Sequence, residues 1–265
     1  MRLDDMAKNT DIGQIYDQEF FDDIEPASLR SSEVVVPILV DLFHPQSVVD
    51  VGCGTGGWLL PFKKLGLTKI LGIDGGDVHR SLLIEPDEFV PCDLTHPLSI
   101  EASFDLALCI EVAEHLPAHS ARVLVDSLVG LAPLICFSSA VPGSGGTGIG
   151  HLNEQWPAYW EQKFKEVGYL MFDPIRPLIW QDNRVAWYYR ENLFVLARQD
   201  IVAANPVFQQ LASGYAQHHM MLLHDSVLAY HLALLPSLKR LPGLFVRALT
   251  RILRSILATE PRRNP

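Results

Sequence analysis

The chain has 265 residues, of which 48% are apolar, a composition that suits one globular domain with appendages. Lys and Arg number 21 against 31 Asp and Glu, and the net charge of -10 argues against a duplex nucleic-acid partner, which needs a basic face. Four cysteines without zinc-site spacing, no recognisable signal peptide and no apolar run of about 20 residues predict a cytoplasmic protein with reduced thiols.

The first 30 residues are charged and only weakly periodic. A helix is predicted from Ser31 or Ser32 to Phe43, because apolar residues recur there at helical spacing. His44-Pro45 is expected to end this helix, since the residue before a proline disfavours helical backbone.

Short apolar runs then alternate with helical ones. The predicted strands are Ser47–Val51, Ile70–Ile73, Glu88–Pro91, Phe104–Ile110, Leu134–Ser138, Tyr169–Phe172 and Asn192–Ala197. The predicted helices among them are Trp58–Leu65, Ser120–Leu131 and about Trp156–Val167. Continuous apolar strands separated by helices are typical of a parallel sheet covered on both faces. We therefore predict an α/β fold with a doubly wound, mostly parallel sheet.

A glycine-rich turn follows the first predicted strand, in the run Val49-Asp-Val-Gly-Cys-Gly-Thr-Gly56. Gly52, Gly54 and Gly56 let the backbone turn tightly and approach a ligand where a Cβ would clash. The helix after them offers unpaired N–H groups to a polar or anionic group. A purely structural turn and a dehydrogenase are the rival interpretations, but a dehydrogenase usually shows G-x-G-x-x-G, whereas these glycines alternate strictly.

Three acidic residues accompany this turn. Asp50 lies inside the strand, where an isolated carboxylate is costly without a partner. Asp74 ends the next strand, at the place of an acid that accepts the hydroxyls of a ribose. Asp93 follows the third strand and suits an adenine amino group.

Together these motifs resemble the class I S-adenosylmethionine-dependent methyltransferases. The matching runs are Val49–Gly56, Gly72–Asp74, Cys92–Leu94 and Phe104–Val112, within a resemblance that covers roughly residues 30–200. The resemblance implies a seven-stranded sheet with a reversed last strand and S-adenosylmethionine as the cofactor. It also implies that Asp50 and the glycines face the methionine part, Asp74 the ribose and Asp93 the adenine. Cys53, Leu94 and Glu111 complete the expected cofactor-binding set.

The fourth predicted strand ends in Glu111-Val-Ala-Glu-His-Leu-Pro117. Glu111, Glu114 and His115 fall within about one helical turn, and two carboxylates with an imidazole suit Mg²⁺ or Mn²⁺. This pattern is similar to that of ubiquinone-pathway O-methyltransferases and small-RNA 2′-O-methyltransferases, which implies a divalent ion that acidifies the acceptor hydroxyl. The RNA enzymes add a later histidine, for which His151 is the counterpart and His119 a nearer but weaker candidate.

The same pattern also occurs in enzymes of this class that use no metal. In that case Glu111 lies near the cofactor, and His115 either packs or accepts the acceptor's proton as a general base. Both interpretations stay open, with His115, Glu111 and His151 as the expected catalytic residues.

Two features lie farther along the chain. The loop Pro142–Gly150 has five glycines and no phosphate-loop ending, so it is either a mobile cover over the acceptor or a plain connector. We expect most of a set of aromatic residues to be core, with one or two touching the acceptor. This set is Trp156, Trp160, Trp180, Trp187, Tyr188 and Tyr189.

The last segment is set apart by its charge. Residues 239–265 hold seven Lys or Arg and one acid, and an amphipathic helix there would carry its arginines on one side. Such a helix lies on an anionic membrane surface, or it packs on the acidic domain or a second subunit as a homodimer contact. The predicted organisation is a segment capping the cofactor site (1–30), a Rossmann-like methyltransferase domain (31–200) and a helical extension with a basic amphipathic tail (201–265).

The first functional hypothesis is an enzyme that methylates a hydroxyl on a sugar-containing or other small metabolite. The alternatives are a non-catalytic, cofactor-binding scaffold that recruits a partner or membrane through its C-terminal helix, and an RNA 2′-O-methyltransferase, which the acidic charge disfavours. The expected location is the cytoplasm, either free or peripheral to a membrane.

Overall fold

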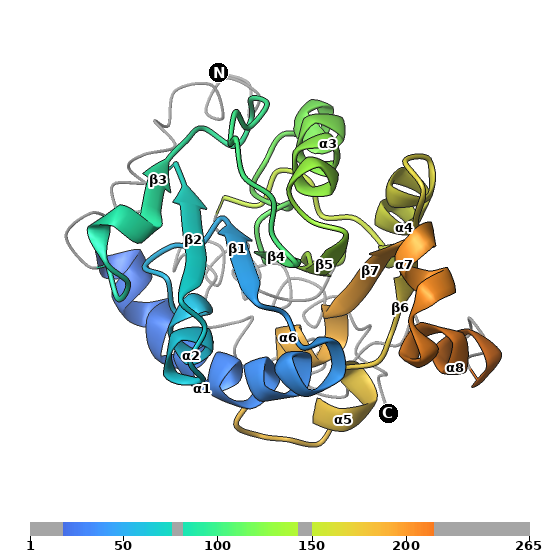
Figure 1. The fold of residues 1–265 in the computed structure, drawn as a ribbon. Coiled ribbons are helices and arrows are strands. Elements are labelled where there is room, and N and C mark those ends of the chain that lie inside the picture. The colour runs from blue at the N-terminus through green and yellow to red at the C-terminus, as the bar shows by residue number, and fades with distance from the viewer. Residues whose placement is uncertain (1–17, 76–81, 143–149, 215–265) are drawn as a thin grey trace, which may run out of the picture. The chain divides into compact units, whose positions relative to one another are not determined.

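A computed structural model describes residues 18–75, 82–142 and 150–214, and these residues form a seven-stranded sheet with helices around it (Figure 1). The strands are β1 (Ser47–Val51), β2 (Lys69–Asp74), β3 (Phe89–Pro91), β4 (Leu106–Ile110), β5 (Leu134–Ser138), β6 (Tyr169–Phe172) and β7 (Phe194–Arg198). Their order is β3-β2-β1-β4-β5-β7-β6. Neighbouring strands are parallel except β7, which runs antiparallel to both β5 and β6. The predicted fold class and its reversed last strand are confirmed.

Helices connect and cover these strands. They are α1 (Gln18–Phe43), α2 (Leu59–Lys64), α3 (Ala121–Leu131), α4 (Pro157–Lys165), α5 (Arg176–Ile179), α6 (Trp187–Asn192), α7 (Gln199–Ala204) and α8 (Pro206–Gly214). Short 3₁₀ turns, η3 (Pro86–Glu88) and η4 (Ala118–Ser120), precede β3 and α3. The seven strands and the three helices predicted after residue 50 agree with the structure to within about two residues at each end, as usual for such boundaries.

The start of α1 differs from the prediction. The helix begins at Gln18, so Ser31 and Ser32 lie inside it and are fully buried. The Ser31 hydroxyl donates to the Ala27 carbonyl at 2.6 Å, and the Ser32 hydroxyl donates to the Gly57 carbonyl at 2.9 Å. Ser32 therefore ties α1 to the glycine loop, whereas this bond of Ser31 stays within α1, and neither serine stands at a helix start.

The sheet is apolar on both faces. Val48 and Leu106 pack with α1 and α2 in one core cluster, whereas their chain neighbours Val49 and Ala107 pack with α3 in the other. The split follows from the alternation of side chains along a strand. Figure 1 shows α1, α2 and α6 on one side of the sheet and α3 with α4 on the other. Each fully buried Val or Leu side chain contributes about 1.5–3 kcal/mol, so the two layers fix the sheet firmly.

The reversal of β7 decides what lies at the carboxyl edge of the sheet. Phe194, at the start of β7, pairs with Phe137 near the end of β5, and Val195 pairs with Phe172 at the end of β6. The connection between β6 and β7, residues 173–193, therefore emerges at the edge where β1, β4 and β5 also end. Ligands of open α/β sheets bind at this edge.

Cys53, Cys109 and Cys136 are buried and Cys92 is half-buried, all as free thiols. Among the described helices, not one combines the length and the hydrophobicity needed to span a bilayer. The basic tail, most of the predicted C-terminal extension, residues 1–17 and the centre of the loop Pro142–Gly150 lie outside the described residues.

Candidate functional site

The glycine loop connects β1 to α2 and needs glycine for two separate reasons. Gly52, Gly54 and Gly56 all have positive φ, at 84°, 53° and 91°, a region that side chains with a Cβ rarely adopt. In addition, a Cβ on Gly52 would overlap the side chain of Val112, which follows β4. The loop is therefore pressed against the segment that ends β4.

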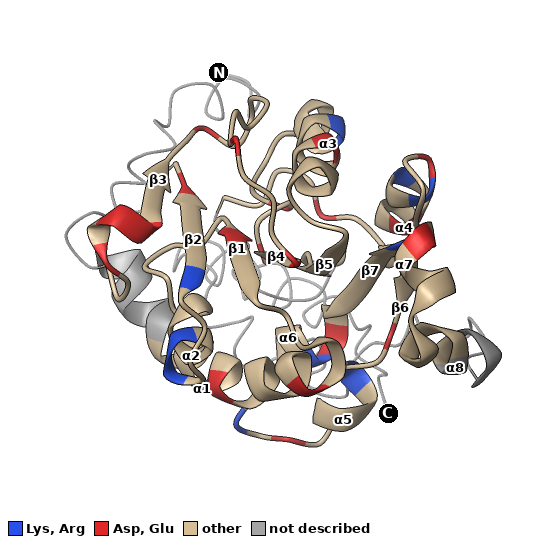
Figure 2. Cartoon of the chain, in the orientation of Figure 1, with Lys and Arg blue, Asp and Glu red and all other residues tan. Residues whose placement is uncertain are grey.

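Asp74, at the carboxyl end of β2, holds this loop from the side. Its Oδ2 accepts the N–H of Gly54 at 2.8 Å. Figure 2 shows acidic residues at the tips of β1 and β2, at the edge where the loop lies. The acid predicted to face a ribose is thus joined to the glycine turn by a hydrogen bond.

Asp50 lies one residue from the end of β1, and its side chain is only 2% exposed. Its Oδ2 makes no hydrogen bond with the rest of the described chain. Burial and, second, the charge of Asp74 raise the pKa of Asp50 to about 7. Such a carboxyl is suited to a cationic ligand group, because a positive charge would favour its ionised form. Burial also raises the pKa of the Cys53 thiol, which stays protonated.

Asp93 follows β3 and is exposed. Its Oδ1 accepts the N–H of Thr95 at 2.8 Å and the Thr95 hydroxyl at 2.7 Å, and its Oδ2 contacts His96 Nδ1 at 3.0 Å. The bonds from Thr95 lower the pKa of Asp93, so it is an ionised acceptor in a fixed orientation. Leu94 beside it is buried.

Glu111 directly follows β4 and has a φ of 55°, in the left-handed region that glycine favours. Its N–H reaches the carbonyl of Ser138 at 3.2 Å and the Ser138 hydroxyl at 3.1 Å. Burial and the neighbouring Glu114 carboxylate raise the pKa of Glu111 well above its ordinary value. Strained backbone of this kind clusters at functional sites in proteins.

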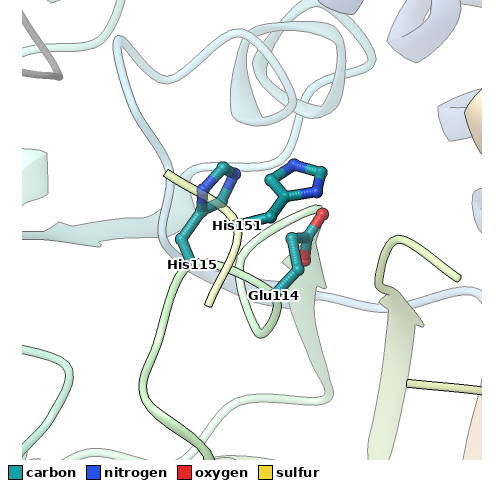
Figure 3. A group of neighbouring side chains, drawn as sticks. All are labelled: Glu114, His115 and His151. Atoms are coloured by element: carbon teal, nitrogen blue, oxygen red, sulfur yellow. The ribbon is translucent and has the colours of Figure 1, made fainter. Parts of the chain in front are cut away.

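Glu114, His115 and His151 converge on one point. One potential ligand atom from each lies within 4.8 Å of those of the other two, and Figure 3 shows both imidazoles beside the Glu114 carboxylate. The Glu114 carbonyl accepts the N–H groups of Leu152 and Asn153 at 2.7 and 2.9 Å. These bonds bring the segment at His151 close to the residues that follow β4, although His115 and His151 lie 36 residues apart in the sequence.

The three side chains differ in their surroundings. Glu114 is fully buried, and neither of its carboxylate oxygens makes a hydrogen bond within the described chain. Burial raises the pKa of Glu114 above its ordinary value. Burial and the His151 ring lower the pKa of His115 to about 4, so its imidazole is neutral at pH 7. His151 Nδ1 lies 2.8 Å from Glu154 Oε1, which fixes the orientation of its ring.

These donors fit a hard divalent cation, because a carboxylate without a hydrogen bond in the described chain and two imidazoles are groups that bind such metals. Glu111 is outside this three-residue cluster, and among the described residues His119 is not part of it either. His119 is exposed in η4.

Sequence reasoning missed Ser138, Asn153 and Glu154 as supporting residues. The spacing of three residues between His151 and Glu154 is a signal that could have found one of them. The other two depend on contacts between β4, β5 and the loop after β5, which spacing alone does not show.

The aromatic residues mostly pack. Trp160 and Tyr189 are almost fully buried, and Tyr189 meets Trp58 of the glycine loop edge to face at 5.1 Å. Burial and the charge of Glu111 raise the pKa of half-buried Tyr188 to about 12. Trp156 is 40% exposed, close to His151 in the chain.

A buried ion pair anchors the connection between β6 and β7. Arg176 Nη2 contacts Asp173 Oδ2 at 2.6 Å, and Arg176 Nη1 donates to the Glu191 carbonyl at 2.7 Å. The guanidinium also lies over the Phe194 ring, 4.3 Å from its centre. The N–H of Ala186 donates to the Ser31 hydroxyl at 3.0 Å, which adds a tie to α1.

Comparison with known proteins gives a family and a fold. Residues 23–133 match the family described as "Methyltransferase domain". No curated protein matches the chain. Because the family match coincides with the strand order and the glycine loop, these residues are a methyltransferase domain of the class I type.

Solved structures with a similar fold include an O-methyltransferase family protein from Burkholderia thailandensis, at 15% identity and a TM-score of 0.52, covering 74% of this chain and 67% of that one. Streptomyces venezuelae DesVI is similar at 14% identity and 0.51, covering 72% and 99%. The magnesium protoporphyrin IX methyltransferase of Synechocystis PCC 6803, with bound S-adenosylmethionine, is similar at 15% and 0.50, covering 72% and 99%. At such identities the likeness shows the fold alone.

Proposed function

We propose that this chain, an S-adenosylmethionine-dependent methyltransferase of the class I type, methylates a hydroxyl on a sugar-containing or other small metabolite. The observation that carries the proposal is the convergence of Glu114, His115 and His151. In the reaction the acceptor oxygen forms a bond to the methyl carbon, while the bond from that carbon to the sulfonium sulfur breaks. The products are a methyl ether, S-adenosylhomocysteine and the proton of the hydroxyl.

The donor side supplies binding and alignment, which such a displacement mainly needs. In this proposal Asp50 and the loop from Gly52 to Gly56 hold the methionine part, with Cys53 against it. Asp74 accepts the ribose hydroxyls, and Asp93 with Leu94 borders the adenine. The partly protonated state of Asp50 supports its role, since a sulfonium and an ammonium would both favour the carboxylate.

The proton of the acceptor hydroxyl has a route at the acceptor side. The neutral imidazole of His115 can accept a proton, although a pKa of about 4 makes it a weak base. Glu114, His115 and His151 would alternatively hold Mg²⁺ or Mn²⁺, which when bound would supply an acidified hydroxyl. The metal is favoured by the weak basicity of His115 and by the buried carboxylate of Glu114, which has no hydrogen bond in the described chain. Glu111, outside the cluster, is assigned to the cofactor side.

The test is methyl transfer from radiolabelled S-adenosylmethionine to a panel of glycans, phenols, amines and RNA. We expect transfer to a hydroxyl acceptor, activated by Mg²⁺ or Mn²⁺ and abolished by EDTA. His115→Ala should lose at least about 100-fold in rate while keeping its affinity for S-adenosylhomocysteine. His119→Ala is the matched control and should keep the rate, because His119 is exposed and outside the cluster.

Methylation of amines alone would overturn the hydroxyl acceptor, and cofactor binding without any turnover would favour the scaffold. Methyl transfer that survives EDTA and does not rise with Mg²⁺ or Mn²⁺ would exclude a metal-dependent reaction. A loss of rate in His115→Ala that is no larger than the loss in His119→Ala would contradict a catalytic role for the cluster.

A further inference from the structure

A second polar feature lies at the carboxyl end of β5, distinct from the three-residue cluster. It is a cavity of about 10 Å³. Phe137 and Phe194 form part of its wall, and Ser139, Trp160 and Asn192 also line it. A cavity of this size has room for about one water-sized group, so it can take a single functional group and no ring.

The polar atoms of this cavity have no partners in the described chain. Neither the Ser139 hydroxyl oxygen, nor the Trp160 indole nitrogen, nor either amide atom of Asn192 makes a hydrogen bond there. The three residues are 5%, 1% and 2% exposed. Buried polar groups are almost always hydrogen-bonded, because an unmade bond costs free energy. Three such side chains around one small cavity point to a ligand atom.

We propose that this cavity is an acceptor subsite that takes one neutral oxygen group, a hydroxyl or carbonyl, other than the hydroxyl that is methylated. The inference rests on the proposed function and specifies its substrate class: an acceptor with at least two oxygen groups.

The chemistry of the lining selects a neutral oxygen. The Trp160 indole N–H only donates, while the Ser139 hydroxyl and the Asn192 amide both donate and accept. A hydroxyl of the acceptor can therefore accept from Trp160 and donate to Ser139 or Asn192. No Lys, Arg, Asp or Glu is among the described residues that line the cavity. An ionic group would be buried there without a counter-charge, which is strongly unfavourable.

The cavity is linked to the cluster through the chain. Gln155, which also lines the cavity, donates from its backbone to the Ala140 carbonyl at 3.3 Å and from Nε2 to Asn153 Oδ1 at 3.0 Å. Asn153 in turn donates its N–H to the Glu114 carbonyl. On the other side, Ser138, the neighbour of Ser139, bonds Glu111. In this proposal one acceptor molecule contacts both places, which the same loop and the end of β5 join.

The test measures the binding of matched probes to protein saturated with S-adenosylhomocysteine, by calorimetry and ligand-observed NMR. The pairs are catechol with phenol, and methyl α-D-glucopyranoside with each of its monodeoxy analogues. For at least one pair, we expect wild-type protein to bind the probe with the extra hydroxyl at least about tenfold more tightly. Ser139→Ala and Asn192→Leu should each reduce this preference towards unity.

Ser120→Ala is the matched control. Ser120 is also buried, at 1% exposed, and its hydroxyl is also without a hydrogen bond in the described chain, but it does not line the cavity. The preference should survive in Ser120→Ala. Trp160→Phe is a further test that removes the indole N–H and keeps an aromatic ring, in case Asn192→Leu fails to fold by circular dichroism.

Equal binding of every pair by the wild type, or a preference that survives in Ser139→Ala and Trp160→Phe, would overturn the subsite and leave a cavity that holds only water. The methyl-transfer panel separates this result from a failure of the proposed function. A preference in binding with methylation of amines alone keeps the subsite and removes the hydroxyl transfer. Methylation of hydroxyls, together with equal binding of the paired probes, supports the proposed function and excludes the subsite.

Discussion

The donor side and the acceptor side of this methyltransferase are built in different ways. On the donor side, one loop and the next strand end suffice, and the loop is tied within the chain by the bond from Gly54 to Asp74, while Asp50 Oδ2 is left without a hydrogen bond in the described chain. The acceptor side gathers segments from β4, the loop after β5 and the connection before β7, and it leaves buried polar groups of Glu114, Ser139 and Asn192 without partners in the described chain. The donor side is therefore built mainly by residues close together in the sequence. The acceptor side depends on contacts between distant segments, and it leaves more polar groups for a ligand to pair.

The strongest way to break the donor side is Gly52→Ala. The new Cβ would adopt an unfavourable positive φ and overlap Val112, and together these effects should lower the free energy of unfolding by about 2–5 kcal/mol. Thermal unfolding followed by circular dichroism measures the loss. Gly66→Ala separates the causes, because Gly66 has a φ of 95° but a Cβ placed there would meet no described neighbour within 4 Å. Equal losses in both variants would show that the contact with Val112 is unimportant.

Asp74→Ala should weaken the donor side without unfolding it. Loss of a charged acceptor costs about 1.5–3 kcal/mol, so affinity for S-adenosylhomocysteine should fall roughly 10- to 100-fold by calorimetry. Asp87→Ala is the control, since Asp87 is exposed in η3 and has no assigned role. Unchanged affinity in Asp74→Ala would contradict the ribose assignment.

On the acceptor side, Glu114→Gln should raise stability while it removes activity. Burial raises the pKa of Glu114, so the free energy of unfolding falls as pH rises above 4.5, where the unfolded chain ionises this group more readily than the folded chain. A neutral amide at this position avoids that loss. We expect a gain of about 1 kcal/mol at pH 7 in EDTA, a rise in Tm of roughly 2–4 °C. Mn²⁺ should stabilise the wild type and not the variant. A less stable Glu114→Gln in EDTA would count against an uncompensated charge, and Glu101→Gln, at an exposed site, should change neither property.

The smallest expected effect is a proton released when the cofactor binds. The raised pKa of Asp50, about 7, leaves it half protonated at pH 7, and a sulfonium would shift it to the carboxylate. Calorimetry at pH 7 in buffers with different ionisation enthalpies should show release of up to about half a proton. Asp50→Asn should abolish the release, and Asp87→Asn, at an exposed site with no assigned role, should retain it. Identical heats in all buffers for the wild type would exclude Asp50 as the group that titrates.

The sequence predicts the strands of the sheet well, because they are continuous apolar runs that end at glycines or acidic residues. The strand from Ser47 to Val51 and the glycine turn after it agree with the structure, since both depend on neighbours along the chain. Ser31 shows where such reasoning stops. Its hydroxyl matches a helix start locally, but α1 begins at Gln18, and Ser31 lies inside it with bonds to Ala27 and Ala186.

The candidate site divides in the same way. The contact of His115 with His151 was predicted only through a family resemblance, whereas the positive φ of Glu111 gave no signal in the sequence. The cavity at Ser139 was not predicted at all. Trp160 and Asn192 reach it from α4 and α6, and such a meeting depends on the packing of the folded chain.

The reversed strand β7 has a consequence for how this protein can change over time. Because β7 pairs with both β5 and β6, the segment from residue 173 to residue 193 begins and ends at fixed points of the sheet. Its interior is not free to vary, because Ile179 and Val185 are buried in the core beside α1, and Tyr189 packs on Trp58 of the glycine loop. The same segment supplies Asn192 to the cavity. A substitution in this segment therefore acts on the cavity and on the glycine loop together, so the two halves of the site are expected to evolve jointly.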